Sequence, residues 1–156
     1  MLFFPPGGGM PKHTVQRYMA VSPVVIASHH TLADAHQIMR ERGIRHLPVV
    51  EGARLVGVVS QRDLYLIETL RGVDASADTV AEAMSAEPYV VPPDAPLEEV
   101  AREMAEHKYG SAVVVQRGEV VGIFTTVDAL RALASVLRRG RPASPLRPPT
   151  RATEPR

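Results

Sequence analysis

The chain has 156 residues and a net charge of +1, and 45% of its residues are hydrophobic while only 4% are aromatic. These values are typical of a soluble globular protein with an aliphatic core. The absence of cysteine excludes disulfides and thiolate metal sites, and it agrees with a location in the reducing cytoplasm. The apolar run at residues 2–4 is too short for a signal peptide, so we expect no association with membranes.

The two ends of the chain differ in composition from the rest. We expect residues 1–12 to form a disordered leader. Residues 138–156 contain six arginines, one glutamate and five prolines, and a segment so poor in apolar residues cannot offset the entropy lost on ordering. We therefore predict a disordered basic tail at 138–156. Its simplest role is that of a solubilising extension, and the alternative is a tether to nucleic acid or another acidic surface.

The first half of the chain predicts a strand, a helix, a β-hairpin and a second helix. The β-branched run Val24–Ile26 is the first strand. Thr31 is a candidate N-cap before apolar residues at helical spacing, and Gly43 ends that helix. Two apolar runs with Gly52 between them then predict the hairpin, and an amphipathic segment predicts the second helix. These elements are expected at residues 47–50, 55–59 and 60–70.

The second half repeats the first. A shift of 65 residues superimposes Val15–Leu64 on Val80–Ala129 without a gap, and 12 of the 50 pairs are identical. Elements are accordingly expected at residues 90–91, 96–107, 112–115, 120–124 and 125–137. Each copy is β-α-β-β-α, and we expect the segments 15–19 and 80–84 each to add a short helical turn before it. A unit of about fifty residues is marginally stable alone, so we predict an α+β fold of two pseudo-symmetric repeats, 13–72 and 78–137, packed sheet to sheet.

Each repeat contains one copy of the motif G-h-h-[ST]-x-x-D, at Gly57–Asp63 and at Gly122–Asp128. The motif lies where a strand is followed by a helix. The hydroxyl can cap the helix while the carboxylate, three residues later, turns toward the same end. A capping box with no further role is the alternative interpretation.

The two motifs occur together with the stretch Gly43–Val50 and the openings Val15–Met19 and Val80–Met84. In this order, twice, they resemble the tandem cystathionine-β-synthase (CBS) domain pair, or Bateman module, a family of regulatory units that respond to adenine nucleotides. The resemblance covers residues 15–137. It implies two clefts between the repeats.

The resemblance also implies ligand-binding roles for particular residues. The hydroxyl–carboxylate pairs would hold ribose, because an ionised carboxylate can accept hydrogen bonds from both hydroxyls of a vicinal diol. These pairs are Ser60 with Asp63 and Thr125 with Asp128. The base would lie between the first strand of a repeat and the backbone just before its second strand. The residues concerned are Val24, Tyr89, Gly110 and Ser111, with the backbone at 45–47.

Positive charge for phosphates is concentrated in the first repeat. The candidates are Arg45, His46 and Arg62, and the second repeat has Gly110, Ser111 and Val127 at the matching positions. Arg62 could reach across the seam to a nucleotide held by the other copy. The alternative is that both arginines are solvated surface charges. If they do bind phosphate, the two sites should be unequal.

No catalytic or metal site is predicted. The six histidines lack the spacing of a metal site, and neither a nucleophile elbow nor a Walker loop is present. We therefore expect a stand-alone regulatory protein, not an enzyme. It would sense AMP, ADP, ATP, NAD or S-adenosylmethionine, form a homodimer, and report to an unidentified effector protein. The alternatives are a ligand-free dimerisation scaffold and a nucleic-acid-binding protein that uses the basic tail.

Overall fold

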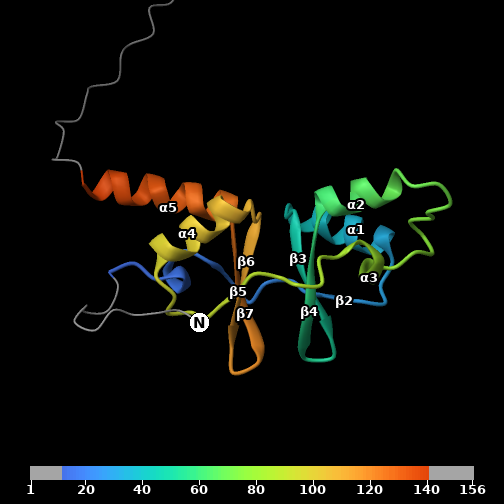
Figure 1. Ribbon diagram of the computed structural model, residues 1–156, viewed down its shortest axis with the longest axis horizontal. Coiled ribbons are helices and arrows are strands. Elements are labelled where there is room, and N and C mark those ends of the chain that lie inside the picture. Colours follow the sequence, from blue (N-terminus) through green and yellow to red (C-terminus); the bar gives the residue numbers. More distant parts are fainter. Residues whose placement is uncertain (1–11, 141–156) are drawn as a thin grey trace, which may run out of the picture.

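The computed structural model describes residues 12–140 (Figure 1). The predicted leader therefore lies outside the described residues except for Lys12, and so does the predicted tail from residue 141 onward. Within this range, no helix is long and apolar enough to cross a membrane.

The first repeat forms the elements in the predicted order. They are β2 (Ile26–Ala27), α1 (Leu32–Arg42), β3 (His46–Glu51), β4 (Arg54–Ser60) and α2 (Gln61–Glu68). The predicted cap of α1 is confirmed, because the Thr31 hydroxyl accepts a hydrogen bond from the Asp34 amide at 3.1 Å. Gly43 ends the helix with a φ of +63°. The first strand begins at Ile26 and not at Val24, because it is Ile26 that comes into parallel register with β3.

The second repeat forms the same series. Its elements are β5 (Val90–Val91), α4 (Leu97–His107), β6 (Ser111–Gln116), β7 (Glu119–Thr125) and α5 (Thr126–Arg139). Helix α4 begins one residue later than the expected start at Pro96, which is its N-cap residue. Helix α5 continues two residues beyond the predicted end at Leu137, so the first residues of the predicted tail are helical.

The two repeats exchange their opening segments. The segment η1 (Val15–Arg17) places Val15 in the core of the second repeat, beside Phe124. Reciprocally, α3 (Val80–Ala83) places Val80 in the core of the first repeat. Each helical turn predicted from the sequence is therefore present, but it packs on the other copy. An exchange of this kind leaves the period of the sequence repeat unchanged, so the period alone could not reveal it.

Strand pairing continues this exchange. Strand β1 (Ala20–Val21) joins the second repeat's sheet, whose order is β1-β7-β6-β5, while the first repeat's sheet has the order β2-β3-β4. In the first repeat, Val58 and Ser85 exchange two backbone hydrogen bonds of 3.0 and 2.9 Å at the edge of β4.

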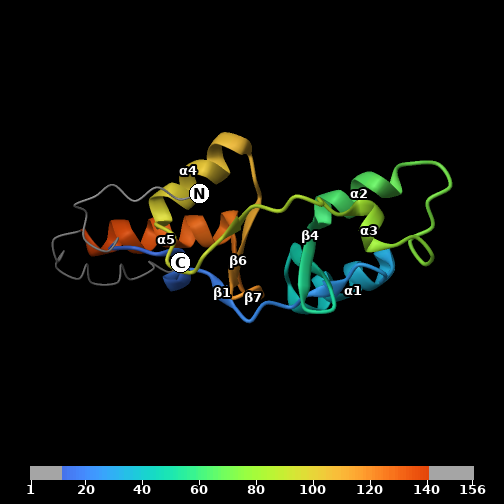
Figure 2. The same cartoon turned by 60° about the horizontal axis from the view of Figure 1, so that its bottom comes forward.

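The two sheets face each other across the centre of the molecule. Helices α1 and α2 lie on the outer side of one sheet, and α4 and α5 lie on the outer side of the other (Figures 1 and 2). Strand β7 contacts both β3 and β4. The prediction of two mixed α/β repeats packed sheet to sheet is thus confirmed, and the seam between the sheets is where residues of both repeats meet.

Candidate functional site

A cavity of about 780 Å³ lies at this seam, and we call it the seam cavity. Cavities that hold small-molecule ligands typically measure about 300–1,000 Å³. Its walls come from both repeats. Eight of the predicted site residues line it: Arg45, His46, Ser60, Arg62, Asp63, Tyr89, Gly110 and Ser111.

Ser60 and Asp63 form the first hydroxyl–carboxylate pair, at the start of α2. The Ser60 hydroxyl accepts a hydrogen bond from the Asp63 amide at 3.1 Å, and Asp63 Oδ2 accepts one from the Ser60 amide at 2.8 Å. The predicted capping box is therefore present. Asp63 Oδ1 makes no hydrogen bond to any residue between 12 and 140, and Asp63 lines the cavity. This carboxylate can cap its helix and still accept a hydrogen bond from a ligand.

Thr125 and Asp128 form the second pair, at the start of α5. Asp128 Oδ2 accepts hydrogen bonds from the Thr125 amide at 2.9 Å and from the Thr125 hydroxyl at 3.0 Å. Its Oδ1 lies 3.7 Å from the guanidinium of Arg131. The second pair is not among the residues that line the seam cavity. Val24 is not among them either, because it packs against the core of the first repeat.

The seam cavity combines different parts of the two repeats. The hydroxyl–carboxylate pair belongs to the first repeat, whereas Tyr89, Gly110 and Ser111, which the sequence suggested for the base, belong to the second. The sequence motifs suggested one site per repeat but did not show which parts of each copy face each other. That pairing follows from the sheet-to-sheet packing.

An aromatic wall lies on the second repeat's side of the cavity. The ring of Tyr89 stacks on that of Tyr109 with 5.3 Å between centroids, and Tyr109 stacks on His107 at 5.1 Å. Burial raises the pKa of the Tyr89 hydroxyl, so this group remains protonated and able to donate at neutral pH. The sequence motifs do not identify Tyr109 and Tyr65 as cavity residues. Three of the chain's four tyrosines line the cavity, and this concentration of a scarce residue type was the available signal.

The charged residues of the cavity are mainly cationic. Arg45, Arg62 and Lys108 line it, against the carboxylates of Asp63 and Glu87. Lys108 was not predicted, because it follows a helix of the second repeat and lies outside the motif. The three cations come from three separate segments. They can therefore surround an anion that a single segment could not enclose.

His46 of the first repeat lies close to Gly110 of the second repeat. A Cβ atom on Gly110 would lie only 2.8 Å from His46 Nε2, so the absence of a side chain at 110 makes room for the imidazole. Burial lowers the pKa of His46 below its ordinary value, as does Arg45, while Asp63 and Asp128 act in the opposite direction. The imidazole is therefore mostly neutral at pH 7.

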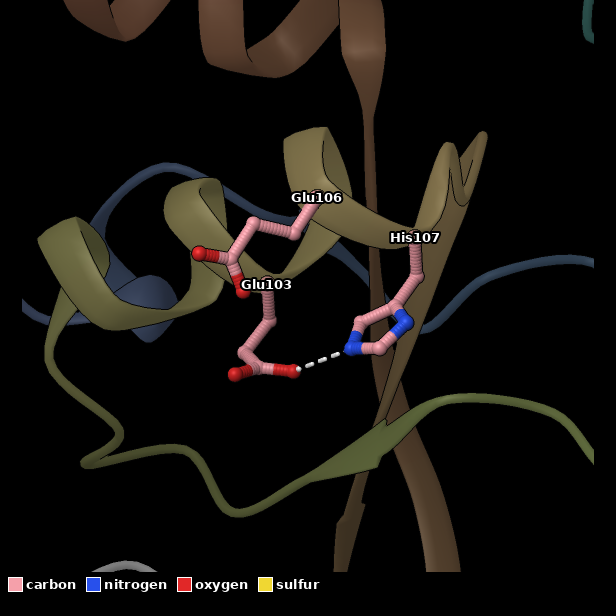
Figure 3. A group of neighbouring side chains, drawn as sticks. All are labelled: Glu103, Glu106 and His107. Atoms are coloured by element: carbon pink, nitrogen blue, oxygen red, sulfur yellow. Dashed lines mark ion pairs between the residues drawn. The ribbon is translucent and has the colours of Figure 1, made fainter.

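A separate group on α4 brings together three side chains of types that can bind metals. Ligand atoms of Glu103, Glu106 and His107 lie within 4.8 Å of one another, and Glu103 pairs with His107 at 3.1 Å (Figure 3). Glu106 and His107 are exposed, and all three side chains come from one helix. Such groups are common on exposed helix surfaces, so we assign no metal to this one.

A family model of the CBS domain matches residues 15–67 and 80–135. The chain is 31% identical over 121 residues to hypoxic response protein 1 of Mycobacterium tuberculosis, a match that covers 77% of this chain and 85% of that protein. It is 32% identical over 106 residues to inosine-5'-monophosphate dehydrogenase of Korarchaeum cryptofilum, where the match spans 67% of this chain but 21% of the enzyme.

Two solved structures of similar fold contain adenosyl compounds. CBSX2 of Arabidopsis thaliana, in complex with AMP, has a TM-score of 0.68 and 30% identity, and the match covers 81% of this chain and 99% of that one. The CBS domain pair of protein MJ0100, in complex with 5'-methylthioadenosine and S-adenosyl-L-methionine, has a TM-score of 0.72 and 26% identity, with coverage of 81% and 99%. Together with the two family-model matches, these similarities show that the chain belongs to the CBS domain family and contains a tandem pair of such domains.

Proposed function

We propose that the chain is a regulatory protein that binds an adenine nucleotide in the seam cavity. The observation that carries this proposal is the position of the first hydroxyl–carboxylate pair. Asp63 lines the cavity and uses Oδ2, not Oδ1, for its helix cap, and the second repeat contributes Tyr89 and Gly110, an aromatic ring and backbone polar groups, to the same cavity. A nucleoside needs both features, since its ribose diol donates hydrogen bonds and its base has apolar faces and polar edges.

The ligands of similar proteins support this choice. AMP in one neighbour, and 5'-methylthioadenosine with S-adenosylmethionine in another, share the adenosine part that the seam cavity is suited to bind. NAD also contains that part. We therefore propose an adenosine-containing ligand, held at its ribose by Ser60 and Asp63.

The regulatory mechanism that we propose is linkage between ligand binding and the arrangement of the repeats. A ligand in the seam cavity would touch both repeats at once. It therefore stabilises one relative arrangement over others by its differential affinity, and the population shifts accordingly. A partner protein that distinguishes the arrangements would read this shift.

We further propose that two copies of the chain associate through α2 and α5. These helices lie along the same side of the molecule (Figure 1), and both carry large exposed apolar side chains. They are Tyr65, Leu66 and Leu70 on or just after α2, and Val127, Leu130, Leu133, Val136 and Leu137 on α5. A surface that contains pseudo-equivalent helices suits an isologous dimer. Sedimentation velocity should show a dimer for the wild type and a monomer for Leu133→Glu, and a wild-type monomer at high concentration would contradict the proposal.

A ligand panel tests the proposed function. Thermal unfolding is followed with AMP, ADP, ATP, NAD and S-adenosylmethionine, with GTP as a purine control. A true ligand at a hundredfold excess over its Kd should stabilise the fold by about 2.7 kcal/mol. The stabilisation should fall to about 0.4 kcal/mol in Asp63→Asn, which keeps an acceptor for the helix cap but should bind the ligand about 100-fold more weakly. Flat responses to every adenine compound would favour a ligand-free scaffold instead.

A further inference from the structure

Lys108 adopts a backbone conformation that glycine normally occupies. It caps the C-terminus of α4 with a φ of +58°, in the left-handed region. At the equivalent position in the first repeat the residue is Gly43, with a φ of +63°. Left-handed backbone costs free energy in any residue with a Cβ atom, and glycine avoids that cost. The second repeat therefore retains a lysine where glycine would give a more stable turn, and such strain is often found at binding sites.

The strained residue also lines the seam cavity. There it joins Arg45, which precedes β3, and Arg62, which lies in α2. Of the two carboxylates in the wall, Asp63 is assigned to the ribose, which leaves Glu87 against three cations. The positions equivalent to the three cations are Gly110, Val127 and Gly43, and all are uncharged. Positive charge is thus concentrated at the seam cavity, and the pseudo-equivalent positions related by the sequence repeat carry none.

We infer that the seam cavity selects adenine nucleotides with two or more phosphates, and that Lys108 contacts the phosphate chain together with Arg45 and Arg62. This inference rests on the proposed function. Each added phosphate brings negative charge that the cations can neutralise through charge-assisted hydrogen bonds. S-adenosylmethionine carries a sulfonium, an ammonium and a carboxylate group where the nucleotide has phosphates, and its net positive charge makes the same cations disfavour it. Uncharged adenosine gains nothing from them.

The test is calorimetric titration of the full chain with ATP, ADP, AMP, adenosine and S-adenosylmethionine, compared with the variant Lys108→Gly. In the wild type, ATP and ADP should bind at least about tenfold more tightly than AMP, adenosine or S-adenosylmethionine. Lys108→Gly should weaken ATP by about tenfold and leave adenosine unchanged. The same variant should raise the midpoint of thermal unfolding, because it relieves the left-handed strain. A residue with only a structural role would not combine a gain in stability with a loss of ATP affinity.

Arg117 provides a matched control. It is also a cation of the second repeat with a positive φ, +52°, and its equivalent in the first repeat is Gly52. It lies in the turn between β6 and β7, and it is not among the residues that line the cavity. Arg117→Gly should raise the unfolding midpoint without changing ATP affinity.

The outcomes separate this inference from the proposed function. Equal affinities for ATP and adenosine, tighter binding of S-adenosylmethionine, or unchanged ATP affinity in Lys108→Gly would overturn the inference. If adenosine still binds the wild type and not Asp63→Asn, the proposed adenosine site survives that result. Failure of every adenine compound to bind would overturn both.

Discussion

The two hydroxyl–carboxylate pairs have the same local structure but different surroundings. Both pairs cap a helix, with the carboxylate on the amide of the capping residue at 2.8 Å in the first pair and 2.9 Å in the second. Asp63 then has a free oxygen at the wall of the seam cavity, whereas Asp128 has Arg131 beside its second oxygen. A shared motif therefore ensures the cap, and the surrounding residues decide whether the carboxylate can also serve a ligand.

The differences lie at a few equivalent positions of the repeat. Arg62 corresponds to Val127, and Lys108 corresponds to Gly43, so charge has been gained or lost without any change in fold. Duplication preserves the packing, which depends on shape and apolar character. It leaves exposed positions free to diverge, and here that divergence makes the two places chemically unequal.

We expect the largest change in nucleotide affinity when Asp63→Asn is compared with Asp128→Asn. An asparagine keeps an acceptor for the helix cap but removes the negative charge that strengthens hydrogen bonds to the ribose hydroxyls. We expect Asp63→Asn to weaken nucleotide binding by about 100-fold, or roughly 2.7 kcal/mol. Asp128→Asn should leave binding at the seam cavity nearly unchanged. Titration calorimetry measures both, and equal losses in the two variants would show that the pairs are functionally equivalent.

Glycine-to-alanine substitutions at Gly57 and Gly122 compare how tightly the two exchanged segments pack, because each glycine lies against the segment contributed by the other repeat. A Cβ atom at Gly57 would lie 2.7 Å from the backbone carbonyl oxygen of Ser85, which is held in place by its hydrogen bond to Val58. At Gly122 the atom would overlap only the flexible side chain of Met19. We expect Gly57→Ala to reduce the free energy of unfolding by about 2 kcal/mol and Gly122→Ala by about 1 kcal/mol or less. Urea denaturation measures the difference, and a larger cost at Gly122 would argue against the tighter packing at Gly57.

Variants of Arg62 and Arg131 test whether ATP affinity depends on where an arginine lies or only on the total positive charge. Arg62→Ala should weaken ATP by about tenfold and leave adenosine nearly unchanged, because one charge-assisted phosphate contact is lost. Added salt should reproduce part of this loss. Arg131→Ala removes an exposed arginine outside the cavity and should have no effect on either ligand. Equal losses for adenosine and ATP in Arg62→Ala would mean that Arg62 supports the wall, and no loss would make it a surface charge.

The smallest expected effect concerns His46, whose equivalent in the second repeat is the non-titrating Ser111. A bound phosphate favours the protonated imidazole and raises its lowered pKa. Nucleotide binding therefore takes up a proton, and affinity should fall by about threefold as pH rises from the lowered pKa through neutrality. His46→Gln should remove the part of the pH dependence that the nucleotide's own phosphates do not cause. Titrations of both proteins with ATP at several pH values would show this, and identical profiles would contradict it.

In the protein without ligand, the free energy of unfolding should depend on pH in the opposite sense, rising as pH rises toward neutrality. Because burial lowers the pKa of His46 in the folded state, the unfolded chain binds the proton more readily. The stabilising contribution is fully present above about pH 6.5, the ordinary value for histidine, and it is lost as pH falls toward the lowered pKa. Urea denaturation of the wild type and His46→Gln between neutral and mildly acidic pH measures it.

Local features of the fold could be read from the sequence because each depends on neighbouring residues. Thr31 as an N-cap, Gly43 as a helix end and the two G-h-h-[ST]-x-x-D motifs are of this kind, and the structure contains all of them. The exchange of Val15 and Val80 between the repeats could not be read in this way. A buried valine is equally suitable for either core, and only the three-dimensional packing decides which one it enters.

Some residues of the candidate site could likewise be identified from the sequence, whereas others could be identified only from the fold. Motif spacing led to Ser60 and Asp63. The family resemblance implied Val24 and Tyr89 alike for the base, and only Tyr89 is among the residues that line the seam cavity. Lys108 lies outside every motif. The role that we propose for it depends on a helix end that the fold brings to the same cavity as the first repeat's hydroxyl–carboxylate pair, and no local sequence pattern records that proximity.

The most direct test is a crystal structure of the chain with bound ATP. We predict that the nucleotide lies in the seam cavity, with its ribose hydroxyls within hydrogen-bonding distance of Asp63, its base against Tyr89 and its phosphates beside Arg62 and Lys108. Nucleotide bound by Thr125 and Asp128 while the seam cavity remains empty would contradict it.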